Sequence, residues 1–141
     1  MNDAYTSALF DIVKDTAAKR GYELPEPIEA YVVMLLASYV DKPNFLPDTF
    51  ATAYLTIKNP NDAKELADTC LFVAGVFPTM GERKGLKRKY YQDIGVSSYE
   101  IVAEARNPEL FSTLATHFMF LSDFIEVVTC CSKYEQTNLF R

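Results

Sequence analysis

The chain has 141 residues, of which 49% are hydrophobic and 13% aromatic, and its formal net charge is −5. This apolar content excludes a chain that is disordered throughout, because disordered chains bury too little apolar surface to offset the entropy of ordering. The negative charge argues against general affinity for nucleic acids or anionic membranes, which attract positively charged proteins. The length suits one packed domain, so we predict a single domain over residues 1–141.

We expect no N-terminal secretory signal and no membrane-spanning helix. The segment from Met1 to Arg20 is amphipathic and contains three aspartates, where a secretory signal needs positive charge. The longest apolar run, Ala30 to Val40, is about half of the roughly 20 residues that a membrane-spanning helix requires. We therefore expect a cytoplasmic protein with no membrane partner, and secretion by a specialised route is compatible with the same sequence.

Helical periodicity dominates the first half of the chain. Apolar residues recur with helical spacing up to Gly21, a residue that suits a helix C-terminus. Pro27 suits the first turn of a second helix, because its missing N–H has no helical partner there. This second helix is apolar on nearly all sides, so we expect it at the centre of the domain. A third, shorter helix is predicted from Asp48 to Ile57.

A fourth and a fifth helix follow. Polar residues from Asn59 suit the start of the fourth helix, and Pro78 and Gly81 suit its end. The fifth helix is expected from about Leu86 to Arg106. It is either split at Gly95 or continuous, with Gly95 allowing a neighbouring element to approach closely, and we favour the continuous helix.

The last helix begins at Asn107 and Pro108, which suit an N-cap and a first turn. Its apolar stripe spans more than five helical turns: Leu110, Leu114, His117, Leu121, Phe124, Val128 and Cys131. No β-hairpin signal or internal repeat occurs. The sequence therefore predicts an all-α, single-domain helical bundle of five or six helices, with a short flexible C-terminal tail over about residues 135–141.

A dense positive segment follows the fourth helix in this otherwise acidic chain. Five of the fourteen basic residues, here called the basic cluster, directly precede Tyr90 and Tyr91: Arg83, Lys84, Lys87, Arg88 and Lys89. Charge and aromatic stacking together can hold a phosphate, a nucleotide or an RNA backbone. A solvated loop and helix start explains the same residues, and we favour it, since nucleic-acid binding needs a wider positive surface.

Asp68 stands inside the otherwise apolar fourth helix. An unpaired buried carboxylate is costly, so an inward-facing Asp68 needs a partner, and the candidates are the arginines and tyrosines between Arg83 and Tyr99. The alternative is an exposed Asp68 on a polar edge shared with Glu65.

His117 is the only histidine and falls on the predicted buried stripe of the last helix. A buried imidazole can act as a general base or bind a ligand, or it can be a core residue satisfied by local partners, which we favour. A single histidine and the absence of a C-x-x-C pair argue against a metal site, and we expect no cofactor. No phosphate-binding glycine loop or nucleophile elbow is present, so the sequence leans away from an enzyme. Cysteines in apolar helical surroundings are expected as reduced thiols.

The middle of the chain resembles a known family. Residues 67–78 have the sequence Ala-Asp-Thr-Cys-Leu-Phe-Val-Ala-Gly-Val-Phe-Pro, followed by Tyr90-Tyr91, Gly95 and Tyr99. This resembles a family of small uncharacterised bacterial helical proteins with the pattern G-D-x-x-L-F-x-x-G-x-F-P, then Y-Y-x-x-x-G-x-x-x-Y, although Ala67 stands where the family has glycine. The resemblance implies a bacterial source and one spatial cluster of Asp68, Tyr91, Gly95 and Tyr99, and it implies no activity.

Three functional hypotheses follow. The first is a non-catalytic bacterial cytoplasmic domain that binds a protein partner, including itself, since its nine tyrosines and ten phenylalanines are residue types favoured at interface cores. The second is a binding protein or enzyme for a small anionic ligand, with a pocket around Asp68, Tyr91, Tyr99 and His117 and the basic cluster at its mouth. The third, which we favour least, is single-stranded nucleic-acid binding through Arg83 to Lys89.

Overall fold

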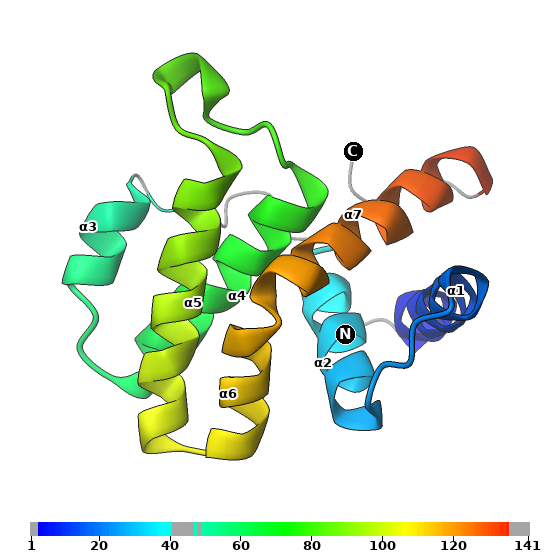
Figure 1. The fold of residues 1–141 in the computed structure, drawn as a ribbon, viewed down its shortest axis with the longest axis horizontal. Helices are drawn as coiled ribbons and strands as arrows, with labels where there is room; N and C mark the ends of the chain where they lie inside the picture. The colour runs from blue at the N-terminus through cyan, green and yellow to red at the C-terminus, as the bar shows by residue number, and fades with distance from the viewer. Residues whose placement is uncertain (1–2, 41–46, 48, 136–141) are drawn as a thin grey trace. The chain divides into compact units, whose positions relative to one another are not determined.

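The computed structural model describes residues 3–40, 47 and 49–135, and side chains as far as Cys130. These residues form seven α-helices and one short 3-10 helix and contain no β-strand, which confirms the all-α class (Figure 1). The predicted number of five or six helices is too low. The flexible tail expected over residues 135–141 lies, apart from Glu135, outside the described residues.

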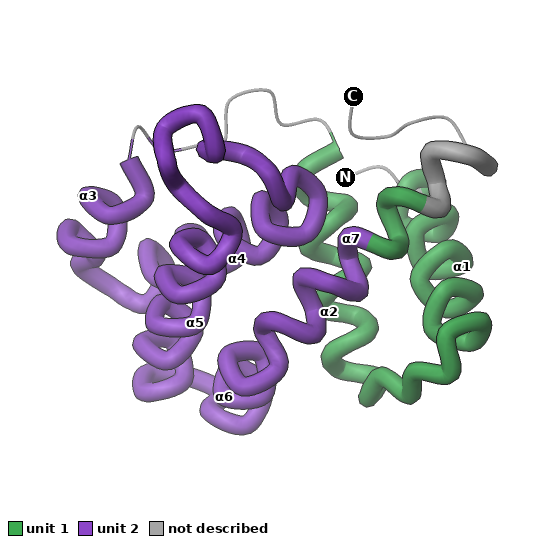
Figure 2. The backbone as a smooth tube through the Cα atoms, turned by 45° about the horizontal axis from the view of Figure 1, so that its top comes forward, with its two compact units in different colours: residues 1–44, 127–141 green, residues 45–126 purple. Residues whose placement is uncertain are grey.

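The chain divides into two compact units (Figure 2). Residues 1–44 and 127–141 belong to the smaller unit, and residues 45–126 belong to the larger one. The helix α7 (Phe118–Glu135) contributes residues to both. The prediction of one domain over the whole chain stays a prediction.

The smaller unit contains α1 (Asp3–Arg20) and α2 (Glu26–Ser38), which pack against each other. An ion pair of 2.8 Å between Lys14 Nζ and Glu29 Oε1 joins the two helices, and this carboxylate raises the pKa of Lys14. The helix α2 buries Ile28, Val32, Val33, Leu35 and Leu36, whereas Met34 is 41% exposed. Its expected place at the centre of the domain stays a prediction.

The larger unit is built around α4 (Pro60–Val76), which contacts α3 (Phe50–Leu55) and α5 (Arg88–Ala105). Every residue from Thr69 to Gly75 is buried, so the second half of α4 is buried on all sides. As expected, Asn59 caps α4: its side-chain oxygen accepts a hydrogen bond of 2.9 Å from the backbone N–H of Asp62.

The helix α5 is continuous through Gly95, which confirms the favoured prediction. A Cβ at Gly95 would collide with the ring of Phe118 and would lie 3.0 Å from the Cβ of Cys70. Phe118 is fully buried and its ring also contacts Tyr99 and lies at the start of α7. Glycine is therefore required here because three elements, α4, α5 and α7, approach each other closely.

The predicted last helix is broken. It consists of α6 (Pro108–Thr116) and α7, and the axes of α6 and of α7 as far as Cys130 differ in direction by 73°. His117 lies at the break and is exposed, so its expected place on a buried stripe is wrong. Because of the break, the apolar residues of α6 and those of α7 do not form one continuous stripe. His117, between the two helices, belongs to neither buried face.

Within the described residues, no single helix is both long and apolar enough to cross a membrane. The bent pair formed by α6 and α7 up to Cys130 meets the criteria of length and composition only when both helices are taken together.

Replacing Gly95 by alanine is expected to destabilise the protein, although alanine is the better helix former by about 1 kcal/mol. The added methyl group must displace the locked ring of Phe118, and such overpacking costs about 1–3 kcal/mol. Urea unfolding of the Gly95→Ala variant measures the change. If the collision is the cause, Phe118→Leu costs less in the Gly95→Ala protein than in the original one, whereas additive effects would contradict this explanation.

Candidate functional site

Arg88, a member of the basic cluster, is bound to its surroundings on two sides. Its Nε donates a hydrogen bond of 2.8 Å to the carbonyl of Ala74, near the end of α4. Its Nη1 donates a hydrogen bond of 2.8 Å to Asp123 Oδ1 of α7. Its Nη2 lies 3.3 Å from Glu126 Oε1, within ion-pair distance but outside hydrogen-bond geometry. Arg88 therefore connects α5 to α4 and α7.

The Ala74 carbonyl needs this partner because of Pro78. In an α-helix a carbonyl accepts a hydrogen bond from the N–H four residues later, and here that residue is Pro78, which has no N–H. The guanidinium of Arg88 supplies the missing donor. Arg88 thus has a structural role and is not available to bind a ligand.

The other four members of the basic cluster differ in whether their side chains have a partner. Lys89 forms an exposed ion pair of 3.1 Å with Asp93, one turn further along α5. Arg83, Lys84 and Lys87 are exposed and have no hydrogen bond or ion pair through their side chains within the described residues. Only these three cations are free to attract an anion.

Asp68 faces Tyr99, which is one of the partners predicted for it. The Tyr99 hydroxyl donates a hydrogen bond of 2.6 Å to Asp68 Oδ1, and Lys64 Nζ lies 3.0 Å from Asp68 Oδ2. Tyr99 is fully buried, and its ring contacts those of Phe111 and Phe118. Asp68 and Tyr99 therefore join α4 to α5 within the core, and neither lines one of the pockets found in the larger unit.

The structure does not bring together the four residues of the predicted pocket, Asp68, Tyr91, Tyr99 and His117. Tyr91 and Tyr99 are eight residues apart on the continuous α5, which separates them by roughly 12 Å along the helix axis. His117 is exposed at the end of α6. Of the cluster that the family resemblance implies, Asp68 and Tyr99 are joined, and Tyr91 belongs to a different place.

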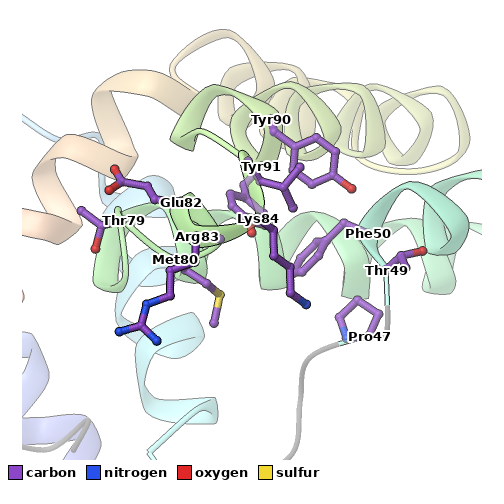
Figure 3. A pocket seen from close by; sticks show the side chains of 12 residues that line it. Pro47, Thr49, Phe50, Thr79, Met80, Glu82, Arg83, Lys84, Tyr90 and Tyr91 are labelled. Carbon is purple, nitrogen blue, oxygen red and sulfur yellow. The ribbon is translucent and has the colours of Figure 1, made fainter.

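A pocket of about 690 Å³ lies at the N-terminal end of α5, beside the 3-10 helix η1 (Glu82–Lys84), and we call it the η1 pocket (Figure 3). It combines aromatic and aliphatic side chains with charged ones, and it is lined by Pro47, Thr49, Phe50, Thr79, Met80, Gly81, Glu82, Arg83, Lys84, Leu86, Tyr90 and Tyr91. Its volume falls in the range of about 300–1,000 Å³ that is typical of small-molecule sites. Four of the predicted site residues, Arg83, Lys84, Tyr90 and Tyr91, thus come together here.

The aromatic wall of the η1 pocket is held by contacts between α3 and α5. The rings of Phe50 and Tyr91 meet edge to face, with centroids 4.9 Å apart, and Tyr90 and Tyr91 meet in the same way at 5.1 Å. The Tyr90 hydroxyl accepts a hydrogen bond of 3.1 Å from the backbone N–H of Ala51. Tyr90 therefore has a positioning role, because it ties the start of α3 to α5.

Gly81 brings the loop after α4 against Tyr91. Its φ of 85° lies in the left-handed region that favours glycine, and a Cβ at this position would collide with the Tyr91 hydroxyl. Tyr91 is only 3% exposed, and its burial raises the pKa of the phenol above its ordinary value. At neutral pH its hydroxyl is therefore protonated and able to donate a hydrogen bond.

Neither the buried cysteine nor the η1 pocket offers a nucleophile with a matched base. Cys70 is buried, and burial raises the pKa of its thiol, which keeps it protonated and a poor nucleophile. The lining of the η1 pocket includes neither cysteine nor histidine. In the part of the chain that the structure describes, no group of three or more His, Cys, Asp or Glu side chains is placed to hold a metal ion.

Sequence reasoning missed the apolar half of the η1 pocket. Phe50, Met80 and Leu86 come from three segments, and nothing in their local patterns distinguishes them from core residues. The available signal was the pair Gly81 and Gly85, since glycine favours the positive φ that both adopt in this turn. Residues Glu82 to Gly85 are exposed, so the expected solvated loop forms the edge of the pocket.

Comparison with known proteins finds no protein-family model, curated protein or solved structure that matches this chain. The resemblance to the small bacterial helical family stays a prediction, and function must be argued from the site.

Removing the Arg88 side chain is expected to destabilise the protein by about 1–3 kcal/mol in the Arg88→Met variant, because the buried Ala74 carbonyl loses its charged donor. Arg88→Lys should recover only part of this, since an ammonium cannot reproduce the fork that reaches both Ala74 and Asp123. Chemical unfolding measures both. The matched control, Lys87→Met, changes an exposed cation and should stay within about 0.5 kcal/mol; equal losses in Lys87→Met and Arg88→Met would contradict the structural role.

Removing the Tyr99 hydroxyl is expected to cost about 1–3 kcal/mol of stability, because Tyr99→Phe keeps the ring contacts and deletes a hydrogen bond to a carboxylate. Tyr54→Phe is the control, since the Tyr54 hydroxyl has no hydrogen bond within the described residues. Unfolding of Tyr99→Phe, Asp68→Asn and the double variant gives the coupling between the two residues. A coupling free energy near zero would show that the contact contributes nothing to stability.

Proposed function

We propose that this protein binds a small anionic ligand with an apolar or aromatic body in the η1 pocket. The observation that carries the proposal is the meeting of unpaired cations with an apolar wall. Arg83 and Lys84 have no ion-pair partner within the described residues, and they line the same cavity as Phe50, Met80 and Tyr91. Binding sites for small molecules combine a mostly apolar lining with a few polar groups that orient the ligand.

Binding is better supported than catalysis. The pocket contains a single carboxylate, Glu82, and no histidine or cysteine, so it offers no nucleophile with a matched base. Nucleic-acid binding is also less well supported, because Arg88 and Lys89 are engaged in ion pairs and only three cations of the basic cluster remain. Three charges supply little of the phosphate neutralisation that such binding requires.

Self-association is a second candidate. Met119 and Phe120 are adjacent on α7 and are 40% and 37% exposed, and Leu55 on α3 is 81% exposed. Isolated exposed apolar residues are common on protein surfaces, so this observation carries less than the pocket does. A bacterial source and a cytoplasmic location are also proposed, on the family resemblance and on the sequence features described above.

Titration with anilinonaphthalene sulfonate, an anion with an aromatic body, tests the binding proposal. The dye should bind saturably and shift the amide NMR signals of residues that line the η1 pocket. Met80→Trp fills the pocket and should weaken binding about tenfold, equivalent to about 1.4 kcal/mol.

Met34→Trp is the matched control, because Met34 is an exposed methionine of the smaller unit and should leave the affinity unchanged. If the dye shifted only the amide NMR signals of residues near Met119 and Phe120, the η1 pocket would not be the binding site. Native mass spectrometry of the same sample tests the second candidate: a dimer supports self-association, and a monomer at all concentrations contradicts it.

A further inference from the structure

The η1 pocket is lined by a tyrosine whose hydroxyl has no hydrogen-bond partner among the described residues. Tyr91 as a whole is only 3% exposed, but its hydroxyl keeps contact with solvent. The ring is held by Phe50 and Tyr90, so the hydroxyl stays at the pocket. A ligand with a charged acceptor can replace the water at this hydroxyl, and hydrogen bonds to charged groups are stronger than those between neutral groups.

Four backbone N–H groups of the loop beside the pocket are engaged within the loop itself. The amides of Glu82, Lys84, Gly85 and Leu86 donate to carbonyls of the same loop, over distances of 2.8–3.3 Å. Phosphate and sulfate are usually held by several converging backbone N–H groups, as at helix N-termini and nests. These four amides are already used, so fewer backbone N–H groups remain near the pocket than a typical phosphate site offers.

The charge available in the pocket suits a monoanion. Glu82 offsets one of the two cations that line it. Figure 3 shows the Lys84 side chain extending toward the side on which Phe50 and Pro47 lie, whereas the guanidinium of Arg83 points away from Tyr90 and Tyr91. One ammonium and one phenolic O–H are matched by the two oxygens of a single carboxylate.

We infer that the ligand of the η1 pocket is a monocarboxylate with an apolar body, whose carboxylate accepts a hydrogen bond from the Tyr91 hydroxyl and pairs with the Lys84 ammonium. This inference rests on the proposed function, which it narrows from anions in general to carboxylic acids. The body of the ligand contacts Phe50, Met80 and Leu86, the apolar part of the lining. Aryl acids and medium-chain alkyl acids share this chemistry.

Four probes test the inference by amide NMR titration of the full chain: phenylbutyrate, decanoate, phenyl phosphate, and phenylbutyramide, the uncharged counterpart of the first. Phenylbutyrate, decanoate or both should shift the signals of residues that line the η1 pocket. Phenylbutyramide should bind about tenfold more weakly than phenylbutyrate, and phenyl phosphate should also bind more weakly. The tighter of the two acids identifies an aryl or an alkyl body, and either result supports the inference.

Three variants separate the roles of the residues. Tyr91→Phe preserves the ring contacts and should weaken acid binding by about five- to tenfold, and Lys84→Gln should weaken it by about tenfold. Lys87→Gln is the control, because Lys87 is an exposed, unpaired cation that does not line the pocket, and it should change the affinity less than about twofold. Equal effects of Lys84→Gln and Lys87→Gln would show only general attraction to positive charge and would overturn the inference.

The outcomes distinguish this inference from the proposed function. If phenyl phosphate binds more tightly than phenylbutyrate, or Tyr91→Phe changes nothing, the carboxylate assignment is wrong and anion binding in the pocket stands. If neither these probes nor anilinonaphthalene sulfonate shifts the signals of the pocket, both the inference and the proposed function fail.

Discussion

Arg88 donates to the Ala74 carbonyl at the point where Pro78 leaves the last turn of α4 without a donor. The same guanidinium reaches Asp123 of α7, so three helices of the larger unit meet at one side chain. Because Arg88 is the first residue of α5, its hydrogen bond to Ala74 holds the start of α5 next to the end of α4. The segment between these two residues is therefore a loop whose two ends lie close together. This loop folds back on the N-terminal end of α5 (Figure 1). The η1 pocket lies beside it (Figure 3). A proline that removes one hydrogen bond, and an arginine that replaces it, therefore determine where the loop lies.

The five cations of the basic cluster have different structural roles, although they lie within seven residues of one another in the sequence. Lys89 is paired along its own helix and Arg88 is paired across helices. Arg83 and Lys84 line the pocket, and Lys87 is exposed and outside it. A charge pattern predicts that cations are close together. It does not predict which of them has a partner, because the partners Ala74 and Asp123 are distant in sequence and come into reach only through the packing of α4 and α7.

Local signals predicted the parts of the fold that depend on local physics. The all-α class, the cap at Asn59, the continuous α5 and the close approach at Gly95 follow from periodicity, capping and the size of glycine. The contact between Asp68 and a tyrosine was anticipated because a carboxylate in an apolar helix needs a partner. The break at His117 was not anticipated, since no proline or glycine stands there and the helical spacing continues through it. Directly after the break, Phe118 packs against Gly95, a contact between residues that sequence alone does not bring together. The pocket was only half predicted for the same reason: its charged residues are adjacent in sequence, and its apolar residues are not.

The short length of α3 has a consequence for the wall that it contributes. A helix of six residues has too few internal hydrogen bonds to persist in water by itself. Contacts with α5 help to stabilise it: the Tyr90 hydroxyl accepts a hydrogen bond from the amide of Ala51, and Phe50 meets Tyr91 edge to face. The wall of the pocket and the residues that hold the wall are thus the same aromatic side chains. Any molecule that packs against Phe50 also adds to the contacts that keep α3 helical, so occupancy of the cavity and the folding of this segment are thermodynamically linked.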